Sequence, residues 1–307
     1  MAEKDVIDSV EIRKAEVEDA EKLSELYNEV WEGKYPLNDF TEIKEVKKKI
    51  QEGHFWYLAY LDNKCIGSAV GTYDKVNNTV EFGRAVMVKE YRSQGISKKL
   101  YKFIRNEILE SKVDILWGSL RNKAIYEISN DCLMTPTGYF EYYFVNQREV
   151  QLISMRLTEK GKKKRILSKV NNLYKLSAIK KIIKEMNLEE GVEGNYPNDV
   201  VVPFGIEEEE IFIKGNYQKP NKSLSIKSIF DKNKLPEYLQ VILLIDKLKY
   251  FDFFKNLGFK ITAFLPAWLQ KNDLRYDCIL LTNSFNPALI QDKYLKNMFE
   301  EFKKGFE

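Results

Sequence analysis

The sequence predicts an α/β protein of the α+β kind. We expect a mixed, mostly antiparallel twisted sheet flanked by helices, followed by a second, smaller α/β domain. Residues 10–88 show the order strand, two helices, three strands. An apolar strand then runs through a short polar turn directly into a helix over residues 86–101. Apolar strands and one helix recur between residues 239 and 281, which indicates a second sheet-forming region.

Composition limits the classes of function. The chain has 307 residues, 44% of them hydrophobic and 31% charged, enough for one large or two ordinary domains. The net charge of +3 is too small to favour a nucleic-acid partner. Three widely separated cysteines favour reduced thiols in the cytoplasm, and a single histidine argues against a zinc site. No apolar run approaches the roughly 18 residues of a membrane span. We therefore predict a cytoplasmic protein without a membrane or metal partner.

The first half of the chain predicts regular elements in order. A strand at 10–13 precedes helices at 16–31 and 41–51, whose apolar residues recur three or four apart. Strands at 54–61 and 65–73 flank a polar turn and predict a hairpin, and 79–88 is the next strand. His54 opens the hairpin, where we expect a structural or exposed side chain.

The segment after this strand is a candidate phosphate site. Its residues are Arg92, Ser93, Gln94, Gly95, Ile96, Ser97 and Lys98. The first N–H groups of a helix have no internal acceptor and carry the positive end of the helix dipole, so they can bind a pyrophosphate. Arg92, Lys98 and Lys99 would add positive charge. The alternative is an ordinary strand-to-helix turn.

These residues resemble motif A of the GNAT acyltransferase superfamily, in which an Arg/Gln-x-x-Gly-x-Gly/Ala loop binds acyl-coenzyme A. Ser97 departs from the pattern, because the family usually has Gly or Ala there. Ile12-Arg13-Lys14-Ala15 resembles the family's opening strand. The resemblance implies acetyl-CoA or another acyl-CoA as co-substrate and no metal. It also implies that the backbone of Met87 and Val88 pairs with the pantetheine arm, with the amide of Val88 or its neighbour polarising the thioester carbonyl.

The resemblance further suggests catalytic residues. Glu81 lies on the strand leading to the loop and is the candidate general base; alternatively it pairs with Arg84 or faces solvent. Asn122 is a candidate cofactor contact, and Tyr126 a candidate proton donor to the leaving thiolate. The family's tyrosine lies about seven residues after the asparagine, which is Ser129 here, so Tyr126 could instead be core filler. Other hydroxyls expected near the cleft belong to Tyr139, Tyr142 and Tyr143.

The rest of the chain suggests three domains. A strand at 113–120, a helix at 124–130 and strands at 138–145 and 150–157 would complete an acyl-CoA-binding domain over 1–157. Residues 158–194 would form a basic helical linker, with ten basic residues against one acidic residue between 159 and 184. Its amphipathic helix at 160–184 would dock an acidic carrier or partner protein, or pack one face on the main body.

Residues 195–307 would form a GNAT-like domain without a phosphate loop. Strands are predicted at 200–204, 211–214, 239–245, 258–261, 264–268 and 276–281, with a helix at 249–257. The run Phe253–Phe259 resembles the end of the last helix of a GNAT fold. Trp268, Tyr276 and Asp277 are candidate acceptor contacts, with a structural role as the alternative.

Three functions are compatible with these features. The first is a GNAT-type N-acyltransferase, most simply an N-acetyltransferase, acting on a primary amine of a small molecule. The second is an acyltransferase acting on a carrier protein or another macromolecule. The third is a non-catalytic module that binds or senses coenzyme A.

Overall fold

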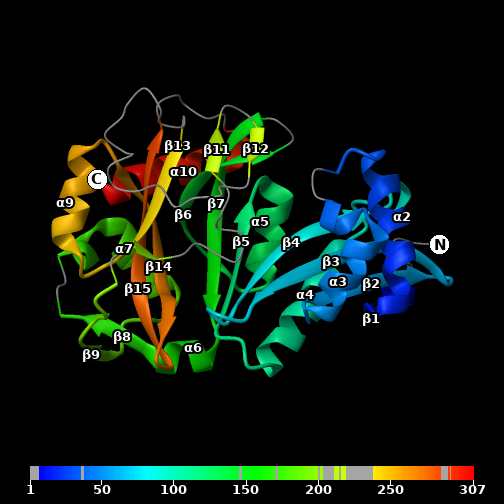
Figure 1. Cartoon of the computed structure of the whole chain (residues 1–307), viewed down its shortest axis with the longest axis horizontal. Helices are drawn as coiled ribbons and strands as arrows, with labels where there is room; N and C mark the ends of the chain where they lie inside the picture. Colours follow the sequence, from blue (N-terminus) through cyan, green and yellow to red (C-terminus); the bar gives the residue numbers. More distant parts are fainter. Residues whose placement is uncertain are drawn as a thin grey trace. The chain divides into compact units, whose positions relative to one another are not determined.

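The computed structural model describes residues 7–35, 38–144, 147–169, 172–199, 201–202, 211–213, 216–218, 238–284, 290 and 292–307 (Figure 1). The chain divides into two compact units. Unit 1 comprises residues 1–118 and 127–134, and unit 2 comprises residues 119–126 and 135–307. The division therefore does not coincide with the boundaries that we expected at 157/158 and 194/195.

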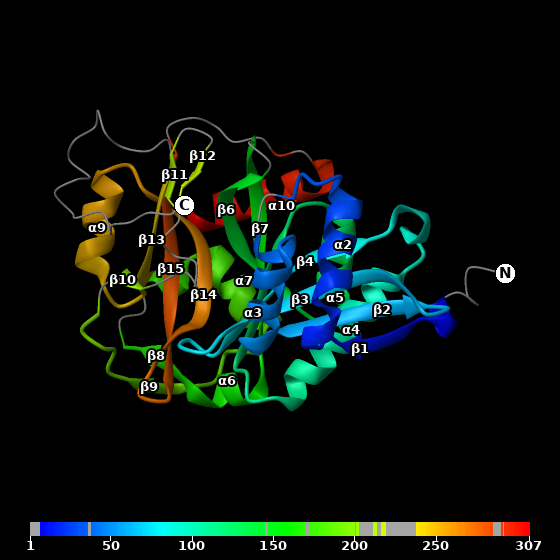
Figure 2. The same ribbon diagram turned by 45° about the vertical axis from the view of Figure 1, so that its right-hand side comes forward.

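Unit 1 is built on the predicted strands (Figure 2). They are β1 Glu11–Lys14, β2 Phe55–Leu61, β3 Lys64–Asp74, β4 Thr79–Met87 and β5 Ile115–Leu120, whose last two residues fall in unit 2. β1 to β4 are antiparallel neighbours, whereas β4 and β5 run parallel. Asp62 and Asn63 both have positive φ at the β2–β3 turn, which matches the right-handed twist of the flanking strands and confirms the hairpin.

Helices supply the apolar layers of unit 1. The elements are η1 Val17–Asp19, α2 Ala20–Trp31, η2 Asn38–Phe40, α3 Ile43–Gln51, η3 Lys89–Tyr91 and α4 Ile96–Glu110. One core cluster joins Leu23 and Tyr27 of α2 to Trp56 and Val86 of the sheet. A second cluster joins α4 residues to the sheet, including Leu100, Ile104, Val80 and Leu116. Because β side chains alternate between faces, α2 and α4 cover opposite sides of this sheet.

An ion pair fixes the start of unit 1. Arg13 donates from both terminal nitrogens to the Asp19 carboxylate, at 2.5 and 2.7 Å, and also to the Tyr60 hydroxyl at 2.9 Å. Asp19 accepts the backbone N–H of Glu16 at 2.8 Å. The arginine of the Ile12–Ala15 motif thereby ties β1 to the turn before α2. This cap divides the predicted 16–31 helix into η1 and α2.

Unit 2 is a largely antiparallel sheet. Its strands are β6 Thr135–Phe144, β7 Gln147–Leu157, β10 Val201–Val202, β13 Tyr238–Leu244, β14 Lys260–Lys271 and β15 Leu274–Ser284. They lie in the order β7-β6-β14-β15-β13-β10, all antiparallel. β8 Arg165–Ser168 pairs parallel with β15 and with β9 Val192–Gly194. A short hairpin joins β11 Ile211–Ile213 and β12 Asn216–Gln218.

Several predictions for the second half are confirmed and others need correction. The 249–257 helix is α9 Leu248–Asn256, whereas the two strands expected at 258–261 and 264–268 are parts of the single strand β14. The helix α10 Lys293–Phe306 was not predicted. The strand expected at 200–204 lies partly outside the described residues, as does the end of the one expected at 211–214.

The predicted basic helix over 160–184 is wrong. The segment forms α6 Glu159–Lys164, then β8, η4 Leu173–Lys175 and α7 Ser177–Glu185. Three of its lysines pair with acids: Lys162 with Glu159 at 3.2 Å, Lys164 with Asp273 at 2.8 Å and Lys181 with Glu301 at 3.2 Å. The apolar spacing breaks because Arg165, the residue after α6, enters the core as a strand residue.

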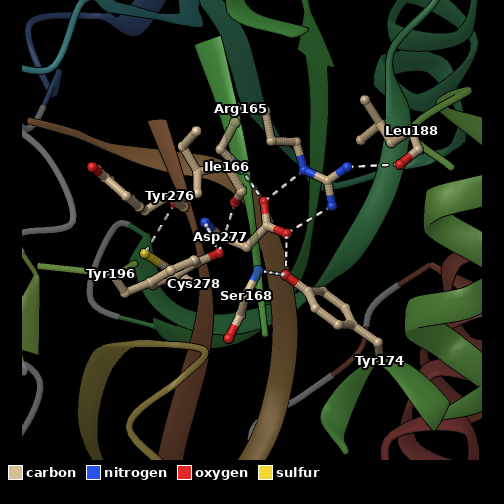
Figure 3. A network of polar contacts seen from close by, with 10 residues as sticks. Arg165, Ile166, Ser168, Tyr174, Leu188, Tyr196, Tyr276, Asp277 and Cys278 are labelled. Carbon is tan, nitrogen blue, oxygen red and sulfur yellow. Dashed lines mark hydrogen bonds and ion pairs between the residues drawn. The ribbon is translucent and has the colours of Figure 1, made fainter. Parts of the chain in front are cut away.

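A buried polar network holds Arg165 there (Figure 3). Its Nε and Nη2 donate to the two Asp277 oxygens at 2.8 and 2.7 Å, and its Nη1 donates to the Leu188 carbonyl at 2.7 Å. The Tyr174 hydroxyl and the Ala267 N–H also donate to Asp277, at 2.6 and 2.8 Å. Both charged side chains are almost inaccessible to solvent, at 1% and 0%.

The network gives Asp277, one of three candidate acceptor contacts, a structural role. Asp277, Tyr276 and Trp268 are all buried. The Tyr196 hydroxyl donates to the Ile166 carbonyl at 3.0 Å and accepts the Asp277 N–H at 3.1 Å. These contacts join β8, β14, β15 and the chain around Tyr196 into one core, which accords with the structural alternative.

Candidate functional site

The loop between β4 and α4 has the backbone shape of an anion cradle. Ser93 and Gly95 both have positive φ, 63° and 78°. The first α4 hydrogen bond runs from the Lys99 N–H to the Gly95 carbonyl at 3.0 Å. The amides of Ile96, Ser97 and Lys98 therefore have no acceptor within the helix. No side chain caps this end, and the first turn carries no acidic residue, so the dipole and the amides favour an anion.

Long side chains around this loop brace its backbone. Arg92 Nε donates to the Met87 carbonyl at 3.0 Å, and Gln94 Nε2 donates to the Glu90 carbonyl at 2.8 Å. Lys98 pairs with Asp131, which also belongs to unit 1. Ile96 is buried, so only its amide is available to a ligand.

Lys99 does not add its charge to the phosphate-binding loop as we predicted. Its Nζ donates to the carbonyl oxygens of Ile7 and Val10, both at 2.8 Å. The side chain therefore anchors the start of the chain beside α4, and its ammonium is committed to those two carbonyls. The amides together with Arg92 and Lys98 remain the phosphate-binding candidates.

A β-bulge in β4 shapes the strand that leads to the loop. The β3–β4 register shifts where Ser68 and Val70 face Val86 and Gly83, and Arg84 has a φ of 52°. The described pairing of β4 with β5 ends at Phe82 and Gly118, directly before the bulge. Bulges bend a strand and increase its twist. The bulge therefore marks where β4 turns away from its parallel neighbour.

Two tyrosine hydroxyls hold the bulge from opposite faces of the sheet. Tyr27 of α2 donates to the Arg84 carbonyl at 2.5 Å, and Tyr101 of α4 donates to the Gly83 carbonyl at 3.2 Å. Burial raises the pKa of Tyr27 and of Tyr101 well above the ordinary tyrosine value. Both therefore stay protonated at neutral pH and donate to the bulge.

The free edge of β4 carries Met87 and not Val88. The Val88 N–H donates to the Ile66 carbonyl of β3 at 3.0 Å. Met87 lies opposite Gly67, and in an antiparallel pair the backbone groups of alternate residues point to opposite edges. The Met87 N–H and C=O therefore point away from β3. We expected the amide of Val88 or its neighbour to face the thioester; this contact engages the Val88 amide and leaves that of Met87.

Glu81 has a basic partner. Its Oε2 lies 3.3 Å from Nη1 of Arg84, whose guanidinium lies over the Phe40 ring at 5.6 Å. Val80 and Phe82, the neighbours of Glu81 on the strand, pack in the α4 cluster. Glu81 therefore projects from the opposite face, which α2 covers. Its side chain is 28% exposed, so the carboxylate is paired but reachable.

Asn122 and Tyr126 belong to unit 2. Asn122 Oδ1 accepts the Ile125 N–H at 3.0 Å and so caps α5 Lys123–Asp131. Tyr126 contacts Tyr294 of α10, with ring centroids 5.1 Å apart. The hydrogen bond with Tyr294, followed by burial, raises the pKa of Tyr126 above its ordinary value. Ser129, at the family's tyrosine position, is buried and has no phenol.

Other candidate side chains are structural or undescribed. His54 is buried; its Nδ1 accepts the Tyr73 N–H at 3.0 Å, and burial lowers its pKa. This confirms a structural role. Tyr139 is buried with its ring 4.5 Å from that of Phe299, whereas the side chains of Tyr142 and Tyr143 lie outside the described residues.

The part of the chain that the structure describes contains neither a cluster of metal ligands nor a membrane-spanning helix. No group of three or more His, Cys, Asp or Glu residues there could hold a metal ion. Within the same residues, no helix has the length and apolarity needed to cross a membrane.

Comparison with known proteins gives the class of the segment around the α4 loop. Residues 20–126 match the family model of the acetyltransferase (GNAT) family. These residues thus form part of a GNAT acetyltransferase domain. A search of curated proteins gave no match.

Solved structures also resemble the chain. A GNAT-family acetyltransferase from Streptococcus pneumoniae is 20% identical, covering 48% of this chain and 99% of its own, with a TM-score of 0.42. A ribosomal-protein-alanine N-acetyltransferase from Brucella melitensis is 17% identical over the same shares, with a TM-score of 0.41. A Sinorhizobium meliloti phosphinothricin acetyltransferase in complex with AcCoA is 14% identical, covering 49% of this chain and 90% of its own, with a TM-score of 0.42.

Proposed function

We propose that this protein transfers an acyl group, most simply acetyl, from acyl-CoA to a primary amine of a small molecule. The observation that carries the proposal is the uncapped start of α4. There Ser93 and Gly95 adopt positive φ and three amides lack helical acceptors. These amides would bind the pyrophosphate of coenzyme A, because the helix dipole and the N–H groups favour the same anion.

The adjoining edge of β4 would bind the pantetheine arm. An extended arm can pair with the backbone of Met87 as an added strand would. The Met87 N–H, which points away from β3, then replaces Val88 as the donor to the thioester carbonyl. Such a donor would stabilise the oxyanion that develops when the amine attacks.

Glu81 is proposed to deprotonate the amine. An ordinary lysine-like amine has a pKa near 10.4, so reaching its neutral form at pH 7 costs about 4–5 kcal/mol. The neutral nitrogen attacks the carbonyl carbon, the C–S bond breaks, and the thiolate takes a proton. Tyr126, the proton donor that the resemblance suggests, belongs to unit 2 and stays a prediction.

A non-catalytic coenzyme A-binding module is the second candidate. The observation in its favour is the ion pair between Glu81 and Arg84, which engages the proposed base. The carrier-protein alternative was based on one basic helix over 160–184, and the structure divides that segment into several elements. Exposed lysines remain on α6 and α7.

The test combines binding with turnover. Calorimetry with acetyl-CoA should show binding that Gly95→Ala weakens at least tenfold, because residue 95 needs positive φ and a Cβ there would lie 2.9 Å from Ile7 Cδ1. Gly53→Ala is the matched control: Gly53 also has positive φ, and a Cβ there would meet nothing within 4 Å. It should show the same backbone strain and unchanged affinity.

Thiol release is then measured over a panel of small amines. The proposal predicts turnover with at least one amine, and Glu81→Gln should lower kcat while leaving the acetyl-CoA affinity unchanged. Binding without thiol release for any amine would favour the non-catalytic module. Absence of acetyl-CoA binding would refute both candidates.

A further inference from the structure

Two β-hairpins of unit 2 follow segments with matching layouts. The hairpin β6–β7 follows the nine-residue helix α5, and the hairpin β14–β15 follows the nine-residue helix α9. Two positions after the last residue of each helix, the backbone adopts the left-handed conformation, at Leu133 (φ 57°) and at Gly258 (φ 89°). Main-chain bonds repeat as well: the Met134 N–H donates to the Ser129 carbonyl, and the Phe259 N–H to the Phe254 carbonyl.

The same irregularity follows in both hairpins. The β6–β7 register shifts between Pro136 and Gly138, and the β14–β15 register shifts between Ile261 and Ala263. The residue bypassed by each shift is a buried threonine, Thr137 or Thr262. Among the described residues, neither threonine hydroxyl has a hydrogen-bond partner. A bulge with an unsatisfied buried hydroxyl is an unusual feature, so its occurrence at both matching positions argues against chance.

The two hairpins meet at these bulges. β6 and β14 run antiparallel, and their described pairing is Gly138 opposite Ala263. Matching residues that face each other are the mark of a two-fold axis, as in an isologous dimer interface. The approach is very close, because a Cβ on Gly138 would lie 2.3 Å from the Ala263 Cα and from the Thr262 carbonyl oxygen.

We infer that residues 238–284 are an internal copy of the segment 115–157 and that they cover the β6 edge as a second protomer would. An uncovered edge strand presents unpaired backbone groups that recruit another chain. Here the partner of that edge is part of the same chain, so the protein carries a single-chain pseudo-dimer in unit 2.

The copy differs from the first segment in what flanks it. β13 pairs antiparallel with β10, whereas β5 pairs in parallel with β4, the strand that leads to the α4 loop. Within the described part of residues 195–237, the strands are β10, β11 and β12, and no helix starts there as α4 does.

Hydrogen exchange and sedimentation test the covered edge in the intact protein. The β6 and β14 amides should be protected to the same degree over roughly a hundredfold range of protein concentration, with a sedimenting mass near 36.1 kDa. A dimer whose β6 amides lose protection on dilution would overturn the inference.

The matching threonines test the two-fold relation directly. Thr137→Val and Thr262→Val each remove a buried hydroxyl that has no hydrogen-bond partner among the described residues, so neither variant should lower Tm. Ser68→Ala is the control and should lower Tm, because it removes the acceptor of the Trp56 indole N–H at 2.7 Å. A lower Tm for one threonine variant and not for the other would refute the equivalence. This result does not depend on acetyl-CoA binding, so failure of the proposed function remains separately visible.

Discussion

Replacing Asp277 by Asn is the most direct test of how unit 2 is stabilised. The carboxylate accepts four described hydrogen bonds: two from Arg165, one from Tyr174 and one from the Ala267 amide. Burial opposes the charge on Arg165, but the facing carboxylate outweighs it and raises the pKa of Arg165 above its ordinary value. The asparagine removes the charge and directs an NH₂ group toward donors.

The expected loss follows from the burial of the pair. Removing one partner of a buried ion pair costs about 3–5 kcal/mol, because the other charge is left uncompensated. A domain is stable by only about 5–15 kcal/mol in total. Asp277→Asn should therefore remove a large part of the stability of unit 2, seen as a shift of its urea midpoint.

Two variants keep the test interpretable. Asp273→Asn breaks the Lys164 ion pair, in which the Asp273 side chain is 80% exposed, and should cost no more than about 1 kcal/mol. Arg165→Met combined with Asp277→Leu removes both charges and should cost less than Asp277→Asn. A loss below about 1 kcal/mol for Asp277→Asn would refute the reasoning.

Two further predictions concern unit 1. Burial alone would raise the pKa of Asp19, but the hydrogen bonds from Arg13 and the Glu16 N–H outweigh it and leave the pKa lowered. The contribution of Asp19 to the free energy of unfolding is therefore complete above about pH 4 and is lost as the pH falls through its lower pKa in the folded state. In urea titrations from about pH 5 to pH 2, the free energy of unfolding should decline less steeply for Asp19→Asn than for the unchanged protein. Equal slopes would contradict this. Tyr27→Phe leaves the Arg84 carbonyl without its donor and should cost about 1–3 kcal/mol. It should also weaken acetyl-CoA binding by loosening the bulge, whereas unchanged affinity would show that the bulge does not shape the site.

Local chemistry explains the parts of the fold that could be predicted. The hairpin followed from a polar turn between two apolar runs, and Asp62 and Asn63 adopt the left-handed conformation that such a turn needs. The loop before α4 followed from the sequence around Gly95, because positive φ and helix initiation depend on neighbouring residues. The family match over residues 20–126 agrees with that prediction.

Contacts between distant residues explain the errors. The apolar spacing of 160–184 favoured one helix, but Arg165 pairs with Asp277 and forms a strand residue instead. The resemblance implied the amide of Val88 or its neighbour as thioester donor, and only the sheet register shows that the Val88 amide already donates to the Ile66 carbonyl. The alternative partner for Glu81, Arg84, was weighed from the sequence, yet only the bulge geometry brings the two side chains within 3.3 Å.

The sequence by itself determined the order of elements in unit 1 and the turn that starts α4, because these depend on residues close together in the chain. Only the tertiary structure decided which amide of β4 is free, which basic residues are already paired, and that Gly138 faces Ala263. Those facts depend on strand register and on burial, which are set by contacts between residues that are distant in the sequence, such as Val88 with Ile66 and Arg165 with Asp277.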